Sequence, residues 1–351
     1  MKKRNVIFLS VLTVLLTVIF SCESRPKLYI YNWASYIPDS VIKKFEEKYK
    51  VRVIYDVFAT NEEMYAKLKS GGTGYDIVFP SKDHVPIMIR EGMIIKLDHS
   101  KLDNIIYIDE RVKRLMDYDP KMEYSIPYFY GASGVMVNTE KVRGFERSWS
   151  IFAKNDFPAK RMTMLDDMRE VMGAALKYLG YSINSTNPAE IEEATNLINT
   201  QWKPNLIKFD ADTFGSGFAN GEFWVVHCYP ENVYDEIKEN KKLLNNMVFF
   251  FPREGGPSYI DNMVILKDSK SIDLAHKFIN FIHEPEIYAE FADTFGLPST
   301  VNTEARKLKK GFSLYNESEL FNTDTIELIE DVGEYLDLYT KAWFNSIITG
   351  Q

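Results

Sequence analysis

Residues 28–56 read LYIYNWASYIPDSVIKKFEEKYKVRVIYD, and their pattern indicates how the start of the chain folds. The apolar run at residues 28–31 predicts a buried strand. Residues 38–48 predict a helix, because Pro38 stands near its start and apolar residues recur at helical spacing. Residues 51–57 alternate in hydrophobicity and predict a second strand. Strand, helix and strand in this order predict an α/β fold with a parallel sheet.

The alternation continues further along the chain. Residues 61–68 predict a helix that ends in the glycine-rich cluster at residues 70–74. Residues 75–79 predict a third strand. In parallel sheets, ligands bind beyond the carboxyl ends of the strands. Here those ends carry Asn32-Trp33 and Pro80-Ser81.

The rest of the chain continues this alternation of predicted strands and helices. Further strands are predicted at residues 162–165, 223–228, 247–251 and 263–266, and further helices at 84–91, 167–179, 188–200, from 232, 272–282 and 285–294. The final segment, residues 326–348, predicts a largely helical tail.

The N-terminus has the pattern of an export signal. A basic segment at residues 2–4 precedes an apolar run at residues 6–20, which is too short and wrongly flanked for an ordinary spanning helix. The run ends at a serine followed by Cys22, which resembles the lipobox of bacterial lipoproteins. We therefore predict a signal peptide over residues 1–21 and a lipidated tether over 22–26. An uncleaved membrane anchor is the alternative, and it leaves the globular part on the same side of the membrane.

The composition indicates an exported, acidic and globular chain. If Cys22 carries lipid, Cys228 has no partner for an internal disulfide, so the hydrophobic core must stabilise the fold. The mature part is long enough for two domains. Removing the basic leader changes the formal net charge from −8 to −11. A chain with this charge attracts cations and repels nucleic acid, which we exclude as a partner.

The sequence carries no recognisable catalytic motif. Its five histidines are scattered without metal-ligand spacing, and there is no Gly-x-Ser-x-Gly elbow. The glycines at residues 71–74 lack the Lys-Ser/Thr of a phosphate loop. His227 and Cys228 are adjacent on a predicted strand, so their side chains point to opposite faces. We therefore predict no catalytic residue, no metal site and no cofactor.

Aromatic, hydroxyl and carboxylate side chains occur near predicted strand ends and helix starts. Asp167 and Glu170 open a predicted helix, and their spacing is also that of a capping box. Each aromatic residue taken alone favours core packing over ligand contact, and the spacing leaves open whether the side chains meet. The candidates are Trp33, Tyr36, Ser81, Asp83, Asp167, Glu170, Tyr229, Tyr259 and Asp261.

Several segments, in order along the chain, resemble the bacterial spermidine/putrescine-binding proteins of ABC import systems. Besides residues 28–56, they are TNEEMYAKL at 60–68, YDIVFPS at 75–81, EGMIIKLDHSKLDN at 91–104, YSIPYFYGASGVMVN at 124–138, DDMREVMGAALKYLGYS at 166–182 and PREGGPSYIDNM at 252–263. The resemblance extends to about residue 300 and is thin beyond it.

This resemblance implies a two-lobed periplasmic-binding-protein fold, type II-like, with the ligand in a cleft between lobes joined by crossover strands. Lobe one is expected at residues 27–133 plus 263–303, and lobe two at 134–262 plus 304–351. The implied protein is no enzyme. It captures a polyamine (spermidine, putrescine or spermine) and delivers it to a membrane permease. It is expected in the periplasm or at the cell surface, held to a bacterial membrane by its lipid.

The resemblance also implies that the nine candidates bind the ligand. Ala34 and Asp83 depart from the family pattern, where a hydroxyl and a tyrosine are usual. The chemistry is consistent, since carboxylates pair with buried ammonium groups and aromatic faces cover the methylenes between them. Two alternatives remain: a receptor of the same fold for another small cationic or polar solute, and an anchored amine-modifying enzyme.

Overall fold

The computed structural model describes residues 25–34, 36–72, 74–154, 160–322 and 325–348. The predicted signal peptide, the lipobox and Cys22 lie outside the described residues. Among the described residues, no helix is both long enough and apolar enough to cross a membrane.

Within the described residues, the first sheet has six strands in the order β11-β10-β3-β1-β2, with β4 also paired to β10. Strands β1, β2 and β3 are mutually parallel, as the sequence predicted, whereas β10 runs antiparallel to β3 and β4. The strands are β1 (Lys27–Trp33), β2 (Arg52–Phe58), β3 (Ile77–Val78), β4 (Ser125–Ala132), β10 (Gly256–Ile265) and β11 (Ile326–Leu328).

The second sheet has five strands in the described chain, in the order β7-β6-β8-β5-β9. Strand β6 is parallel to β7 and β8, and β5 is antiparallel to β8 and β9. The strands are β5 (Gly134–Asn138), β6 (Met162–Leu165), β7 (Leu206–Asp210), β8 (Val225–Cys228) and β9 (Met247–Phe250). Both sheets are thus mixed: the predicted parallel pairing holds for β1, β2 and β3 and for β6, β7 and β8, and the antiparallel partners were not predicted.

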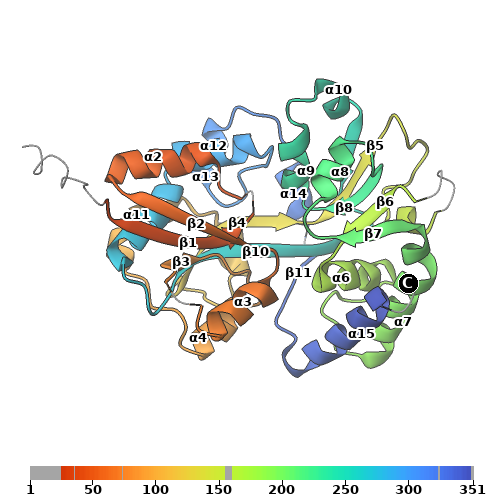
Figure 1. Cartoon of the computed structure of the whole chain (residues 1–351), viewed down its shortest axis with the longest axis horizontal. Coiled ribbons are helices and arrows are strands. Elements are labelled where there is room, and N and C mark those ends of the chain that lie inside the picture. Colours follow the sequence, from red (N-terminus) through yellow and green to blue (C-terminus); the bar gives the residue numbers. More distant parts are fainter. Residues whose placement is uncertain (1–24, 35, 73, 155–159, 323–324, 349–351) are drawn as a thin grey trace, which may run out of the picture.

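Helices cover both sheets and divide the molecule into two halves (Figure 1). Those beside the first sheet are α2 (Asp39–Tyr49), α3 (Asn61–Lys69), α4 (Val85–Arg90), α5 (Glu110–Leu115), α11 (Ile272–Ile282), α12 (Pro285–Thr294) and α13 (Thr303–Leu308). Those beside the second are α6 (Met168–Tyr178), α7 (Pro188–Leu197), α8 (Phe214–Ala219), α9 (Pro230–Ile237), α10 (Lys241–Leu244) and α15 (Leu336–Ile348). Helix α14 (Glu317–Leu320) contacts the first half, where Glu317 pairs with Arg111 and Tyr130 Oη donates to the Leu320 carbonyl.

Two long antiparallel strands connect the halves. Strand β4 belongs to the first sheet and continues through Ser133 into β5 of the second, and β10 lies against β4 along most of its length (Figure 1). The sequence analysis placed a strand only at residues 263–266, so Tyr259 and Asp261 lie inside β10 and not before it. Every residue of β10 and β4 is buried, so neither strand shows the alternating pattern that would have located its ends.

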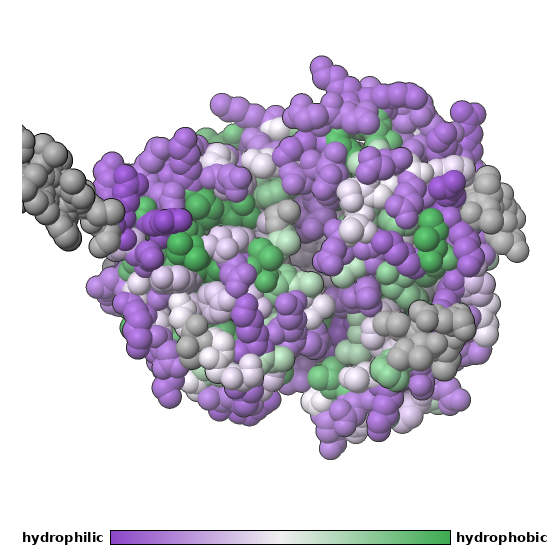
Figure 2. Space-filling model, viewed as in Figure 1, coloured by the Kyte–Doolittle hydropathy of each residue, from purple (hydrophilic) through white to green (hydrophobic). Residues whose placement is uncertain are grey.

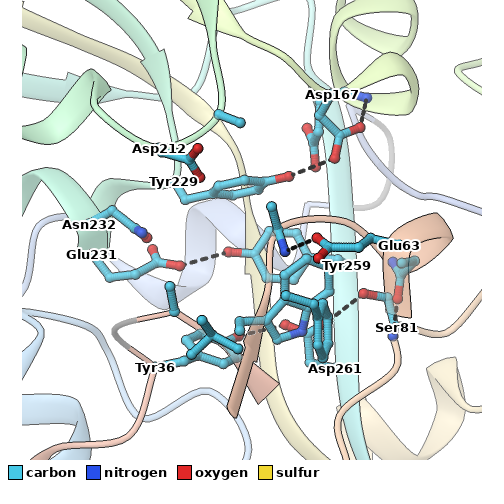
Figure 3. A pocket seen from close by; sticks show the side chains of 18 of the residues that line it. Tyr36, Glu63, Ser81, Asp167, Asp212, Tyr229, Glu231, Asn232, Tyr259 and Asp261 are labelled. Carbon is cyan, nitrogen blue, oxygen red and sulfur yellow. Dashed lines mark hydrogen bonds between the residues drawn. The ribbon is translucent and has the colours of Figure 1, made fainter. Parts of the chain in front are cut away.

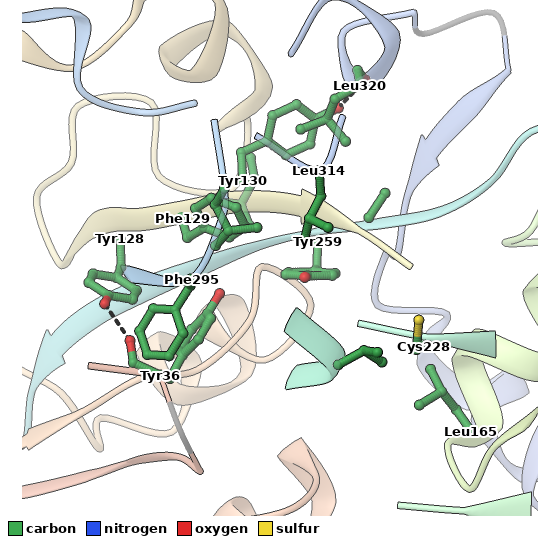
Figure 4. Close-up of a cluster of buried hydrophobic side chains, with 14 of the residues drawn as sticks. Tyr36, Tyr128, Phe129, Tyr130, Leu165, Cys228, Tyr259, Phe295, Leu314 and Leu320 are labelled. Carbon is green, nitrogen blue, oxygen red and sulfur yellow. Dashed lines mark hydrogen bonds between the residues drawn. The ribbon is translucent and has the colours of Figure 1, made fainter. Parts of the chain in front are cut away.

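The core is continuous across these connecting strands. Buried apolar side chains from both sheets form one cluster, part of which is drawn in Figure 4. In the first half, Phe45 of α2 packs against Phe278 and Phe281 of α11, with ring centroids 4.9 and 5.3 Å apart. Cys228 is buried and free, consistent with a fold stabilised by packing.

The predicted helical tail is only partly correct. Residues 326–328 form β11, which pairs with the start of β10, and α15 begins only at Leu336. Ile326-Glu327-Leu328 alternates as a strand does. Gly333, with a φ of 58°, adopts a left-handed conformation that is costly for other residues and separates the strand from the helix.

Candidate functional site

A cavity of about 490 Å³ lies between the two halves. From the first half it is lined by residues at the ends of β1 and β3, by α3 and by β10. From the second half it is lined by the loops after β6, β7 and β8. On the face in view in Figure 2, the boundary between the halves is hollowed and edged mainly by hydrophilic residues. The carboxyl ends of parallel strands from both sheets thus meet at one place, as expected for ligand sites in α/β folds.

All nine candidates from the sequence line this cavity. Figure 3 labels Tyr36, Ser81, Asp167, Tyr229, Tyr259 and Asp261 among them. Trp33, Tyr36, Ser81 and Asp83 come from the first half, and Asp167, Glu170 and Tyr229 come from the second. The remaining two, Tyr259 and Asp261, lie on β10. The structure therefore brings the candidates together, which the spacing along the chain could not establish.

Asp261 is the centre of the first carboxylate group. Its Oδ1 accepts a hydrogen bond from Ser81 Oγ at 2.5 Å, and its Oδ2 accepts one from Tyr36 Oη at 2.6 Å. Tyr36 is held in turn by Tyr128, whose hydroxyl donates to the Tyr36 carbonyl at 2.6 Å (Figure 4). Asp261 is 3% exposed, and burial raises its pKa to about 7 despite the two hydroxyl donors.

Asp167 and Glu170 form the second carboxylate group, at the start of α6. Asp167 caps this helix, since its side chain accepts from the backbone N–H groups of Arg169 and Glu170. Glu170 does not complete the predicted capping box, because its carboxylate accepts from Ser133 Oγ. Burial raises the pKa of both carboxyl groups, and their mutual repulsion adds to the effect on Glu170. Only half of the capping-box interpretation is therefore correct.

Three aromatic side chains form walls between these groups. Trp33 is partly buried, donates from Nε1 to the Phe79 carbonyl at 3.0 Å and packs on Phe58 with centroids 4.5 Å apart. Tyr229 and Tyr259 meet edge to face at 5.5 Å, and the Tyr229 hydroxyl donates to Asp167 Oδ2 at 3.4 Å. These faces give a ligand apolar cover and attract cations.

Asp83 lies at the edge of the cavity beside His84, whose Nδ1 is 2.9 Å from Asp83 Oδ2. Burial opposes ionisation of Asp83, but the neighbouring His84 outweighs it and lowers the pKa of the carboxyl group. The cation Lys82 also lines the cavity and is already paired with Asp117, at 2.9 Å, and with Glu330.

The sequence analysis missed several acidic residues of the cavity. The lining contains ten carboxylates and two cations, Lys82 and Arg169. The carboxylates that were not predicted are Glu62, Glu63, Asp212, Glu231, Asp235 and Glu236. Glu231 directly follows Tyr229-Pro230 at a predicted strand end, so its position could have suggested it. The others lie on helices and loops that face the cavity only because the two halves meet.

His227 and Cys228, the adjacent pair considered above for catalysis, are not among the residues that line the cavity. His227 donates to or accepts from Ser133 Oγ at 2.9 Å, and burial lowers its pKa to about 3. Burial raises the pKa of the Cys228 thiol, which keeps it protonated. Among the described residues, no group of three or more His, Cys, Asp or Glu side chains is arranged to hold a metal ion.

Comparisons with known proteins find relatives over most of the chain. The spermidine/putrescine-binding periplasmic protein of Escherichia coli K12 is 35% identical over 327 residues, covering 92% of this chain and 91% of that protein. The putrescine/cadaverine-binding protein of Pseudomonas aeruginosa PAO1 is 34% identical over 283 residues, covering 77% of this chain and 78% of that protein.

Among solved structures, the TpPotD lipoprotein of Treponema pallidum matches with a TM-score of 0.86 and 46% identity, covering 91% of this chain and 99% of that one. This likeness confirms the two-lobed periplasmic-binding-protein fold, whose two lobes are the two halves described above. Residues 40–317 match the family model of the bacterial extracellular solute-binding proteins. The chain therefore belongs to the bacterial extracellular solute-binding protein family.

Proposed function

We propose that this protein captures a polyamine in the cavity between its lobes and delivers it to the membrane permease of an ABC importer. The observation that carries the proposal is the placement of two buried carboxylate groups, Asp167 with Glu170 and Asp261 with its hydroxyl donors, around one aromatic-walled cavity. A polyamine has charged ends and an apolar middle, so it matches this arrangement. The names of the relatives, which bind spermidine, putrescine or cadaverine, support the same class of ligand.

The carboxylates explain why a cation is required. Burial without a counter-charge raises the pKa values of Asp261 and Glu170, so each carboxylate is poorly stabilised in the free protein. An ammonium group beside each carboxylate supplies the missing charge and donates up to three hydrogen bonds. Neutral sugars and anions cannot do this. The proposed function requires no bond to be broken, and we propose a binding protein and not an enzyme.

The direct test is isothermal titration calorimetry of the purified mature protein with putrescine, cadaverine, spermidine and spermine. γ-Aminobutyrate, lysine and glucose serve as comparison solutes. We expect saturable binding of at least one polyamine and much weaker binding of γ-aminobutyrate, whose carboxylate would meet the acidic lining. The proposal fails if no polyamine binds or if an uncharged solute binds best.

Capture and delivery require the lobes to move, and we propose that they do so about the crossover strands. We propose the sequence-based boundaries, with lobe one at residues 27–133 plus 263–303 and lobe two at 134–262 plus 304–351, except that α13 and α14 go with lobe one because Arg306 pairs with Asp109 and Glu317 with Arg111. The continuous pairing of β4 with β10 provides a connection about which the lobes can rotate. Small-angle scattering should show a smaller radius of gyration with putrescine than without it.

We further propose that the mature protein lies in the periplasm or at the cell surface and is attached to the membrane by lipid on Cys22. The apolar leader that ends at this cysteine supports the proposal. Cys22→Ser should move the protein from the membrane fraction to the soluble fraction. Retention of the variant in the membrane would instead favour an uncleaved anchor.

A further inference from the structure

Glu231 has features that the proposed polyamine site does not yet explain. It lies in the first turn of α9, directly after β8, and lines the cavity. Its side chain points across to β10, where Tyr259 Oη donates to Oε1 at 3.3 Å (Figure 3). Glu231 is 3% exposed, and its Oε2 has no hydrogen-bond partner among the described residues.

A helix-stabilising role does not account for this geometry. A glutamate in the first turn of a helix interacts favourably with the helix dipole, and this requires no burial. A buried carboxylate oxygen without a partner costs free energy, since it has lost water and gained nothing in exchange. Burial raises the pKa of Glu231 to about 7, and nearby Asp261 adds to the effect. Burial of the Glu231 carboxylate therefore costs folding free energy in the protein without ligand.

Asp261 lies near Glu231 in the same cavity. Its two oxygens face Tyr36 and Ser81, and the Tyr259 ring lies beside it on the same strand. A primary ammonium group has three N–H donors and needs three acceptors. Asp261, Glu231 and the Tyr259 hydroxyl oxygen offer these from one end of the cavity. Asp167 lies beyond Tyr229, at the other end of the edge-to-face pair of Tyr229 and Tyr259 (Figure 3).

We infer that Glu231 binds an ammonium group of the ligand together with Asp261 and Tyr259, forming a subsite for a primary amine. The inference rests on the proposed polyamine function and deepens it. A primary ammonium at this end uses all three acceptors, whereas a trimethylated ammonium has no N–H to donate. The subsite thus requires a terminal primary amine, and not merely a positive charge.

The test compares Glu231→Gln with the wild-type protein by calorimetry, using putrescine and a derivative trimethylated at both ends as probes. Glu239→Gln is the matched control, because Glu239 is exposed just beyond the end of α9 and does not line the cavity. We expect Glu231→Gln to raise the Kd for putrescine at least about tenfold, as for loss of a hydrogen bond to a charged group. Glu239→Gln should leave it unchanged.

Each result separates the inference from the function on which it rests. If wild type binds no polyamine, the proposed function itself is wrong. If wild type binds putrescine and Glu231→Gln binds it equally well, only the inference about Glu231 is overturned. Equal Kd values of wild type for putrescine and a derivative whose two ends are both trimethylated would also overturn it. Should Glu231→Gln not fold, Glu231→Asp replaces it in the test. Aspartate keeps the negative charge but is one methylene shorter, so its carboxylate lies further from the ligand. An unchanged Kd of Glu231→Asp for putrescine would overturn the inference.

Discussion

At the scale of single residues, the candidates serve the fold and the ligand to different degrees. The carboxylate of Asp261 lies in the cavity, where the hydroxyl groups of Tyr36 and Ser81 donate to it without neutralising its charge. Trp33 contributes to both the fold and the cavity, because its ring packs on Phe58 and its side chain also lines the cavity. Substitutions at these two positions should therefore affect binding and stability in different proportions.

Asp261→Asn keeps the shape and the hydrogen-bonding capacity of the side chain but removes its charge. We expect polyamine binding to weaken by about 2–5 kcal/mol, the range for breaking a buried charge pair. Calorimetry with putrescine measures this, and Asp268→Asn, at an exposed position after the same strand, is the control. Unchanged affinity would remove Asp261 from the site.

Trp33→Ala should lower the affinity for a polyamine without unfolding the protein. The indole supplies a cation–π face, worth about 2 kcal/mol when desolvated, while its position is only partly buried. Trp33→Phe keeps an aromatic face and should retain most of the affinity. Calorimetry and thermal unfolding are measured in parallel. A large drop in Tm with normal binding would show that Trp33 is a core residue.

At the scale of secondary structure, the start of α6 combines two tasks. Asp167 caps the helix through two backbone N–H groups and also presents its carboxylate to the cavity. A helix start is a rigid place for a ligand group, because the cap fixes the side chain that it uses. The capping pattern was visible in the sequence. The bond from Ser133 to Glu170 was not, because it depends on the crossover strand lying beneath α6.

The two tasks of Asp167 can be separated by substitution. Asn caps a helix about as well as Asp, whereas Ala does not. Asp167→Asn should therefore weaken polyamine binding and leave the free energy of unfolding nearly unchanged. Asp167→Ala should weaken binding and also lower the free energy of unfolding by about 1 kcal/mol. Chemical denaturation and calorimetry provide both measurements. Wild-type affinity in Asp167→Asn would mean that the residue only caps.

At the scale of the whole molecule, burial in the cavity disfavours the ionised form of its carboxyl groups, and a bound cation can offset this cost. Burial raises the pKa values of Asp261 and Glu231 to about 7, well above their usual range near 4. A carboxyl group shifted upward favours the folded state while it is protonated. This contribution is present below about pH 4 and is lost as the pH rises through about 7. A bound polyamine replaces those protons.

Polyamine affinity should therefore rise with pH. Between pH 6.5 and 8.5 the Kd for putrescine should fall about tenfold, because the two carboxyl groups lose their protons while primary amines stay charged. The buried histidines His227 and His283 have lowered pKa values and titrate below this window in the folded protein. Calorimetry at both pH values, repeated in buffers of different ionisation enthalpy, should also detect proton release. A pH-independent Kd without proton release would contradict this account.

The sequence by itself determined the α/β alternation and the ends of β1, β3 and β8 that carry binding residues, and the resemblance of its motifs to a known family suggested the proposed ligand class. These depend on local periodicity, on composition and on motifs that stand close together in the chain. Only the tertiary structure decided that β10 and β4 join the lobes and that residues 326–328 form a strand. It also decided that Glu231 faces Tyr259 and that ten carboxylates surround one cavity. These features depend on contacts between distant segments, and a fully buried strand or an acidic helix face carries no local signal of its partner.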